Sequence, residues 1–222
     1  MRFLFLAFVF LCFQCSPSEL NNPSDFKSDS FRESETLLCL TGQTSACQLA
    51  IPVCTTCRFF STNTTYNGAR GGIVGADAKC MSDSKKPTEP ARAVFKAFLV
   101  DDVNRIACTT SNCLTGGVSE HVDWILKPDT TYVRAVDGAT IVTTNSVGIF
   151  TSQPGDAENP SVTQIITGFD AGGWITRGSG GHCVRWTEGT TGITGLSSSS
   201  NLTITGGGNY CVTPTVILCV EQ

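Results

Sequence analysis

The sequence predicts an α+β domain of short strands and long loops, with one short helix and a set of disulfides. Beyond residue 57, short segments rich in β-branched and aromatic residues alternate with Gly, Asn and Pro signals, as strands alternate with turns. One segment instead places Ile73, Ala76, Asp77 and Cys80 at helical spacing. The twelve Cys residues form an even set, large enough to staple a loop-rich fold. Strands and helices do not alternate along the sequence, so a parallel α/β sheet is not expected.

The composition limits the classes of function. The chain has 222 residues, a formal net charge of −4 and 15% charged residues. Nucleic acid is therefore a disfavoured partner, because phosphate binding requires clustered Lys and Arg. His121 and His182 are the only two His residues, which leaves little for histidine-based metal binding or acid–base catalysis. We expect no enzyme activity, no bound metal and no cofactor.

The N-terminus has the features of an export signal. Met1-Arg2 gives a positive start, and an apolar run follows from Phe3 to Phe13. The run is too short to span a bilayer, which needs about 20 residues, but it suits a signal peptide. A Cys at the end of the run, followed by a polar stretch, is typical of bacterial lipoproteins. This predicts a lipoprotein signal peptide over residues 1–14 and lipidation of Cys15, with ordinary signal cleavage as the alternative.

Two segments are expected between the signal peptide and the domain. Residues 15–38 carry Pro, Ser and charged residues without periodicity, so they are interpreted as a flexible tether. Residues 39–56 are interpreted as a Cys-rich lead-in. The folded domain is expected over residues 57–222.

The cysteines that follow the leader are predicted to form structural disulfides, because an exported chain meets an oxidising compartment. The pairing among the four of the lead-in region has three possibilities and stays open. Cys54 and Cys57 also have the spacing of half a zinc site or of a redox motif, but no second pair follows at zinc-site spacing. The ten predicted disulfide residues are Cys39, Cys47, Cys54, Cys57, Cys80, Cys108, Cys113, Cys183, Cys211 and Cys219.

The expected elements follow in order along the domain. Residues 58–62 suit a first strand, residues 73–80 a short helix, and residues 93–100 either a buried strand or a short helix. Cys108 and Cys113 enclose four residues and are expected to staple a local loop. Further strands are expected over residues 131–135, 139–143, 161–168, 182–187, 202–205 and 215–220.

Four motifs resemble collagen-type endostatin domains, and they occur in the same order. They are GGIVGADAKC over residues 71–80, FKAFL over 95–99, CVRW over 183–186 and LCVE over 218–221. Cys211 falls where the fourth endostatin Cys belongs. With its lipoprotein leader, the chain is similar to the leptospiral endostatin-like outer-membrane lipoproteins. Several motifs in order make this resemblance, which covers residues 57–222, more specific than any single motif.

The resemblance implies a C-type-lectin-like fold. In this fold one or two short helices accompany a twisted, mostly antiparallel sheet, and the chain ends lie close together. The resemblance also implies one disulfide between Cys80 and Cys219 and another between Cys183 and Cys211.

Two residues within these motifs are interpreted as structural. Trp186 is expected in the core, pointing inward together with Val184 on a strand. Asp77 is expected in the first turn of the helix, where the helix dipole favours an acidic side chain.

The resemblance further implies a binding module for host proteins at the bacterial surface. Members of the family are associated with laminin, fibronectin, plasminogen and complement factor H, so extracellular-matrix and complement proteins are the expected partners. The expected contact regions are the loops over residues 136–160, 170–181 and 188–210, because loops on a pinned scaffold commonly carry such contacts. No individual ligand-binding residue is identified. The expected location is the outer membrane or cell surface, with the lipid anchor as the only membrane attachment.

Two other functions stay open. A lectin-like fold permits glycan binding, but calcium-dependent sugar binding needs clustered oxygen ligands. The segments Gln153-Pro154-Gly155-Asp156 and Glu158-Asn159-Pro160 only approach the lectin motifs. The other alternative is a structural envelope lipoprotein without a host ligand. The heparin and zinc sites of endostatin are not expected, because the Arg residues are scattered and no His lies near residue 57.

Overall fold

The computed structural model describes Ser28 and residues 53–152, 154–157, 165–170, 173–178, 180–190, 194–198 and 207–222, with backbone alone for 194–198 and 207. The chain divides into two units, Met1–Ile51 and Pro52–Gln222, and the elements below belong to the second. The predicted signal peptide, the predicted acylation site Cys15, the expected tether apart from Ser28, and Cys39 and Cys47 lie outside the described residues. Within the described part of the chain, no helix combines the length and apolar character that crossing a membrane requires.

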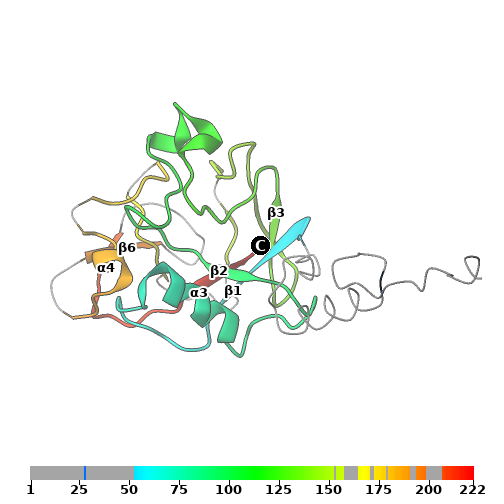
Figure 1. Ribbon diagram of the computed structural model, residues 1–222, viewed down its shortest axis with the longest axis horizontal. Helices are drawn as coiled ribbons and strands as arrows, with labels where there is room; N and C mark the ends of the chain where they lie inside the picture. The colour runs from blue at the N-terminus through cyan, green and yellow to red at the C-terminus, as the bar shows by residue number, and fades with distance from the viewer. Residues whose placement is uncertain are drawn as a thin grey trace, which may run out of the picture. The chain divides into compact units, whose positions relative to one another are not determined.

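A five-stranded sheet forms the centre of the domain, in the strand order β2-β8-β1-β3-β4. β1 and β3 pair in parallel, and the other neighbours pair antiparallel. The strands are β1 (Thr56–Ser61), β2 (Phe95–Ala97), β3 (Thr131–Arg134), β4 (Thr140–Thr143) and β8 (Leu218–Glu221). Since β8 lies between β1 and β2, the first and last strands of the domain are direct neighbours (Figure 1).

A smaller antiparallel sheet has the order β5-β6-β7. It consists of β5 (Ile165–Ile166), β6 (Thr194–Ser198) and β7 (Gly207–Tyr210). The helical elements are α3 (Gly72–Ser82), η3 (Ser111–Cys113), η4 (Gly117–Glu120) and α4 (Cys183–Trp186). The few short helices and the two sheets confirm the predicted α+β class.

Helix α3 forms where the periodicity predicts it. Ile73, Ala76 and Cys80 are its buried residues, and the helix packs against β2 and β8. Asp77 corrects the prediction, because it lies beyond the first turn of α3. Its carboxylate instead accepts a hydrogen bond from the N–H of Ala97 at 2.8 Å and pairs with the buried Arg105 at 2.7 Å. A tertiary ion pair, rather than the helix dipole, therefore explains this acid.

Both faces of the central sheet are buried. Phe59 and Leu218 belong to one core cluster, whereas Phe60 and Cys219 belong to a second cluster that includes the buried face of α3. Adjacent residues on a strand point to opposite faces, so a strand buried on both sides is apolar throughout. Glu221 ends β8 inside the structure, where Arg58 pairs with its carboxylate at 2.7 Å.

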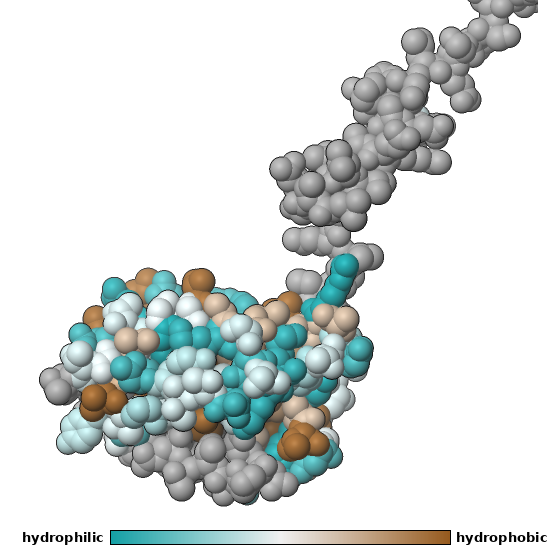
Figure 2. All heavy atoms as spheres, turned by 90° about the horizontal axis from the view of Figure 1, so that it is seen from below, coloured by the Kyte–Doolittle hydropathy of each residue, from teal (hydrophilic) through white to brown (hydrophobic). Residues whose placement is uncertain are grey.

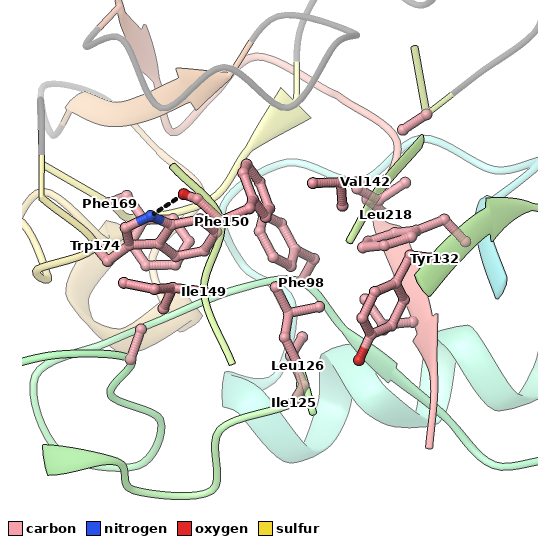
Figure 3. Packing of buried hydrophobic residues seen from close by; sticks show 14 of the residues in the cluster. Phe98, Ile125, Leu126, Tyr132, Val142, Ile149, Phe150, Phe169, Trp174 and Leu218 are labelled. Carbon is pink, nitrogen blue, oxygen red and sulfur yellow. Dashed lines mark hydrogen bonds between the residues drawn. The ribbon is translucent and has the colours of Figure 1, made fainter. Parts of the chain in front are cut away.

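The first core cluster is rich in aromatic side chains that come from loops (Figure 3). The rings of Phe150 and Trp174 meet edge to face, with centroids 4.4 Å apart, and the indole N–H of Trp174 donates to the carbonyl of Phe150 at 3.0 Å. Phe98 and Phe169 pack beside them. Such pairs contribute about 0.5–1.5 kcal/mol beyond burial. The loops after β4 and β5 are thereby fixed to the core.

Four disulfides connect the described cysteines. Cys80–Cys219 joins α3 to β8 and Cys183–Cys211 joins α4 to the end of β7, the two pairings that the resemblance implies. The other two described disulfides close short loops. Cys108–Cys113 is the pair that was expected to staple a local loop. Cys54–Cys57 is one of the pairings that the sequence left open.

Three predicted strands differ from the observed ones. The strand expected over residues 161–168 is present only as Ile165–Ile166, with residues 161–164 outside the description. The strand expected over 215–220 begins at Leu218, and Thr215 instead makes an isolated bridge with Tyr66. The prediction of a strand over residues 182–187 is wrong, and the structure found there is given in the next section. The strand predicted over residues 202–205 lies outside the described residues.

Candidate functional site

The segment Cys183–Trp186 forms one left-handed helical turn instead of the predicted strand. All four residues have positive φ, from 48° at Val184 to 63° at Trp186, and none of them is Gly. Left-handed backbone costs an L-residue roughly 1–2 kcal/mol. Strain of this kind persists only where the surrounding structure enforces it, and it is concentrated at binding and catalytic sites.

Contacts from several elements enforce the turn. Cys183 is bonded to Cys211, and the fully buried Trp186 donates its indole N–H to the carbonyl of Val100 at 3.0 Å. The N–H of Arg185 donates to Nδ1 of His182 at 2.8 Å. Trp186 is therefore in the core as predicted. Val184 is not, because the turn leaves it 47% exposed on the opposite side.

A pocket of about 330 Å³ opens beside this turn. We call it the α4 pocket. A volume of this size is at the lower end of the range found for small-molecule sites, about 300–1,000 Å³. It is lined by Asp102, Thr176, Arg177, Gly178, Gly180, His182, Val184 and Arg185.

The carboxylate of Asp102 lies between the side chains of Arg185 and His182. Arg185 donates to its carboxylate through Nε at 2.7 Å and Nη2 at 3.0 Å. His182 faces the same carboxylate through Nε2 at 3.5 Å. The hydrogen bond from Arg185 lowers the pKa of Asp102, so this carboxylate is ionised at neutral pH. The negative charge of Asp102 is thus compensated by Arg185.

Arg177 brings a second guanidinium to the pocket. Within the described residues, no hydrogen bond or ion pair of this guanidinium is found, and the side chain is half-buried. Its stem lies against the backbone of Gly181, where an added Cβ would meet Cδ of Arg177 at 2.3 Å. Among the lining side chains, two guanidinium groups therefore face one carboxylate. Arg presents a planar fork that suits a carboxylate, phosphate or sulfate group.

Exposed apolar side chains flank the pocket's disulfide. Val184 follows Cys183, and Tyr210 and Val212 lie on either side of Cys211, with exposed fractions of 47%, 62% and 47%. On the face of the domain shown in Figure 2, apolar residues occur as small separate groups among polar ones. Arg and Tyr are enriched in protein-binding hot spots, and this region supplies both types of side chain.

Both ring nitrogens of each His residue lie near polar groups. Nδ1 of His182 accepts from Arg185, and Nε2 faces Asp102 at 3.5 Å. In His121, Nδ1 faces the carbonyl of Ala107 and Nε2 faces the carbonyl of Val147 at 2.7 Å. These contacts join loops that are distant in the sequence.

The cluster Cys108, Cys113 and Glu120 has potential metal ligands within 4.8 Å of one another. The two sulfurs form a disulfide, so neither is available as a thiolate. The Glu120 carboxylate accepts hydrogen bonds from the backbone and hydroxyl groups of Thr109 and Thr110 and from the N–H of Gly116. These contacts describe a carboxylate that organises a loop rather than a metal site.

Glu120→Gln is expected to destabilise the domain at neutral pH. Burial raises the pKa of Glu120, but the hydrogen bonds led by those of Thr110 and Gly116 outweigh it and lower the pKa from 4.5 to about 2. The carboxylate's contribution is therefore complete above pH 4.5 and is lost as the pH falls toward 2. Thermal unfolding over this range measures the effect. The Tm difference between the two proteins should shrink with falling pH, and a constant difference would contradict this assignment.

A second cavity of about 340 Å³ lies between β1 and the loop after α3. Phe59, Phe60 and Val136 contribute apolar walls, and Arg134 at its edge pairs with Asp137 at 2.9 Å. The residues that line this second cavity include no left-handed turn like that of the α4 pocket. The second cavity is therefore the weaker candidate for a functional site.

The sequence predicted only some of the residues that line the α4 pocket. Thr176, Arg177 and Gly178 fall within the loop 170–181 that was expected to make contacts, but Asp102 and Arg185 do not. The near-lectin segments are described only at residues 154–156, because Gln153 and residues 158–160 lie outside the described residues. Since Asp102 and Arg185 are 83 residues apart, no local signal could have joined them.

The fold and the α4 pocket define a disulfide-stapled α+β domain with a cation-rich surface site. The chain belongs to the DUF1554 family, which is described as a protein family of unknown function and whose sequence model matches residues 63–203. The matched range contains the whole α4 pocket and α3, and it ends before Cys211 and β8. Among curated proteins, none matches the chain.

Proposed function

We propose that this chain is a surface-anchored binding module for host proteins, either extracellular-matrix proteins such as laminin and fibronectin or the serum proteins factor H and plasminogen. The observation that carries the proposal is the α4 pocket. There the left-handed turn pinned by Cys183–Cys211 and the exposed Val184 line one pocket with Arg177, whose guanidinium has no partner among the described residues. A guanidinium beside apolar side chains is suited to capturing an acidic side chain of a partner protein.

The finer fold assignment, a C-type-lectin-like or endostatin-like domain, is part of this proposal. It is supported by the pairing of β1 with β8, which brings the domain ends together, and by the disulfide from α3 to β8. The left-handed turn at Cys183–Trp186 differs from the strand that the resemblance implies, so the proposal for this motif rests on its cysteine pairing alone.

The proposed location is the outer membrane or cell surface, with a lipid on Cys15 as the anchor. Its support is the order of a positive start, an apolar run and a Cys followed by polar residues. A lipid anchor and a flexible tether would leave the α4 pocket free to meet soluble or matrix-bound proteins.

Binding of the full, oxidised chain to immobilised laminin, fibronectin, plasminogen and factor H tests the proposal. We expect saturable binding to at least one of these proteins, weaker binding at high salt because exposed charges are screened, and loss of binding after reduction and alkylation. Added EDTA should change nothing, since the proposed contact uses guanidinium groups.

Absence of binding by a chain whose cooperative unfolding shows that it is folded would overturn the proposal for these partners. Binding that requires calcium would favour glycan recognition. A protein that protease cannot reach on intact cells, and that binds no host protein, would favour a structural role in the envelope.

A further inference from the structure

The Cys54–Cys57 disulfide differs from the other three described disulfides in the exposure of its residues. Cys54 is only partly buried, whereas Cys57 has no exposed surface. The six cysteines of the other described disulfides are between 0% and 3% exposed. The neighbouring Thr55 and Thr56 are exposed, and Val53 is 74% exposed. Cys54 is therefore the residue of this pair through which an external thiol can approach.

A lysine faces the accessible sulfur. Nζ of Lys127 lies 3.5 Å from Sγ of Cys54. Burial lowers the pKa of Lys127 below its ordinary value, and the charge of Glu221 offsets part of this shift. Both carboxylate oxygens of Glu221 are held by Arg58 at 2.7 Å. Arg58 thereby balances the negative charge of Glu221, and the ammonium of Lys127 faces the sulfur of Cys54. A positively charged Lys near a Cys stabilises the thiolate form of that Cys.

We propose that Cys54–Cys57 is a thiol–disulfide exchange site, with Cys54 as the reacting sulfur and Lys127 as the group that stabilises its thiolate. The co-reactant is a thiol, R–SH, of a small molecule or a protein. This exchange site is separate from the α4 pocket, and the proposal does not depend on the binding function proposed above.

The exchange runs in two steps. A thiolate R–S⁻ attacks Sγ of Cys54, forming a mixed disulfide and breaking the bond to Cys57. The released Cys57 sulfur takes up the proton that R–SH lost and is placed to donate to the carbonyl oxygen of Cys54, 3.5 Å away. A second R–S⁻ then attacks the outer sulfur of the mixed disulfide and expels Cys54 as a thiolate beside Lys127. Two thiols become one disulfide, and two electrons reduce Cys54–Cys57.

Lys127 acts at both steps through charge. It attracts the incoming thiolate to Cys54, and it makes Cys54 the better leaving group, because a thiol with a lower pKa leaves faster. The buried disulfides lack an accessible sulfur, so they should stay oxidised while the protein is folded.

Reaction of the native full chain with reduced glutathione, quenched by alkylation and mapped by peptide mass, tests this proposal. We expect reduction of Cys54–Cys57 alone, with transient glutathione on Cys54. Lys127→Met should slow the exchange at neutral pH about tenfold, because the positive charge that attracts the incoming thiolate and stabilises the released Cys54 thiolate is lost. Lys127→Arg keeps the charge and should retain most of the rate. Lys85→Met, which removes an exposed lysine outside this site, should leave the rate unchanged.

Three results would overturn the proposal. They are reduction of all four described disulfides together, glutathione found on Cys57, and equal exchange rates for the wild type and Lys127→Met. The first two are read on the wild-type chain, so they hold even if the Lys127→Met variant fails to fold.

Discussion

Replacing Cys80 and Cys219 by Ala is expected to lower the free energy of unfolding by about 5 kcal/mol in the chain-entropy model. The disulfide closes a loop with a sequence separation of 139 residues, the longest of the four described. Without it the unfolded chain gains the most conformational freedom, and the packing of α3 against β8 loses its covalent link. A typical domain is stable by only about 5–15 kcal/mol, so this variant should be close to unfolding at physiological temperature.

Replacing Cys108 and Cys113 by Ala is the matched control. This pair has a sequence separation of only 5 residues, for which the same model gives about 2 kcal/mol. Both variants lose two buried sulfurs, so the difference between them isolates the effect of loop length. Guanidinium unfolding under non-reducing conditions measures both. Equal losses would contradict the entropic account of how Cys80–Cys219 stabilises the fold.

Arg105→Met is expected to cost about 3–5 kcal/mol, the range found when one partner of a buried ion pair is removed. The Arg105 side chain is fully buried and pairs with Asp77 at 2.7 Å and with Asp123 at 2.6 Å. It also donates to the carbonyl of Ala97 at 2.7 Å. Burial lowers the pKa of Arg105, but hydrogen bonds and charge from Asp77 and Asp123 outweigh it and raise the pKa overall. Methionine fills the space but removes the guanidinium that donates to Asp77 and to the carbonyl of Ala97.

Lys96→Met provides the comparison. Lys96 pairs with the same Asp123, but both side chains are about one third exposed. Ion pairs at such positions contribute roughly 0–1 kcal/mol. Chemical denaturation of the two variants should therefore separate them by at least about 2 kcal/mol. A cost for Arg105→Met no larger than that for Lys96→Met would show that this ion pair is not what joins α3 to the loop after β2.

Elements with local signals were predictable from the sequence. The helical spacing of Ile73, Ala76 and Cys80 located α3, and β-branched segments between turn signals located β3 and β4. These patterns predict structure because local periodicity decides which side chains are buried. The disulfide pairings Cys80–Cys219 and Cys183–Cys211 came from the resemblance and not from any local pattern.

Features that depend on distant contacts were not predictable. The motif Cys183–Trp186 has strand-like alternation, but its disulfide and the burial of Trp186 enforce a left-handed turn. Arg105 lies 28 residues after Asp77, so the sequence suggested only a helix-dipole role for that acid. The α4 pocket brings Asp102 to Arg185 through tertiary structure alone.

The most direct test of the central claim is the affinity of three full, oxidised chains for whichever host protein binds the wild type most tightly. Arg177→Gln removes the guanidinium that has no partner among the described residues. It is expected to weaken binding about thirtyfold or more, since truncation of a hot-spot residue costs about 2 kcal/mol or more. Arg92→Gln removes the same charge from an exposed side chain outside the pocket and should leave the affinity unchanged. Equal affinities for the wild type and Arg177→Gln, or equal losses in the two variants, would contradict the claim that this chain binds its partner through the α4 pocket.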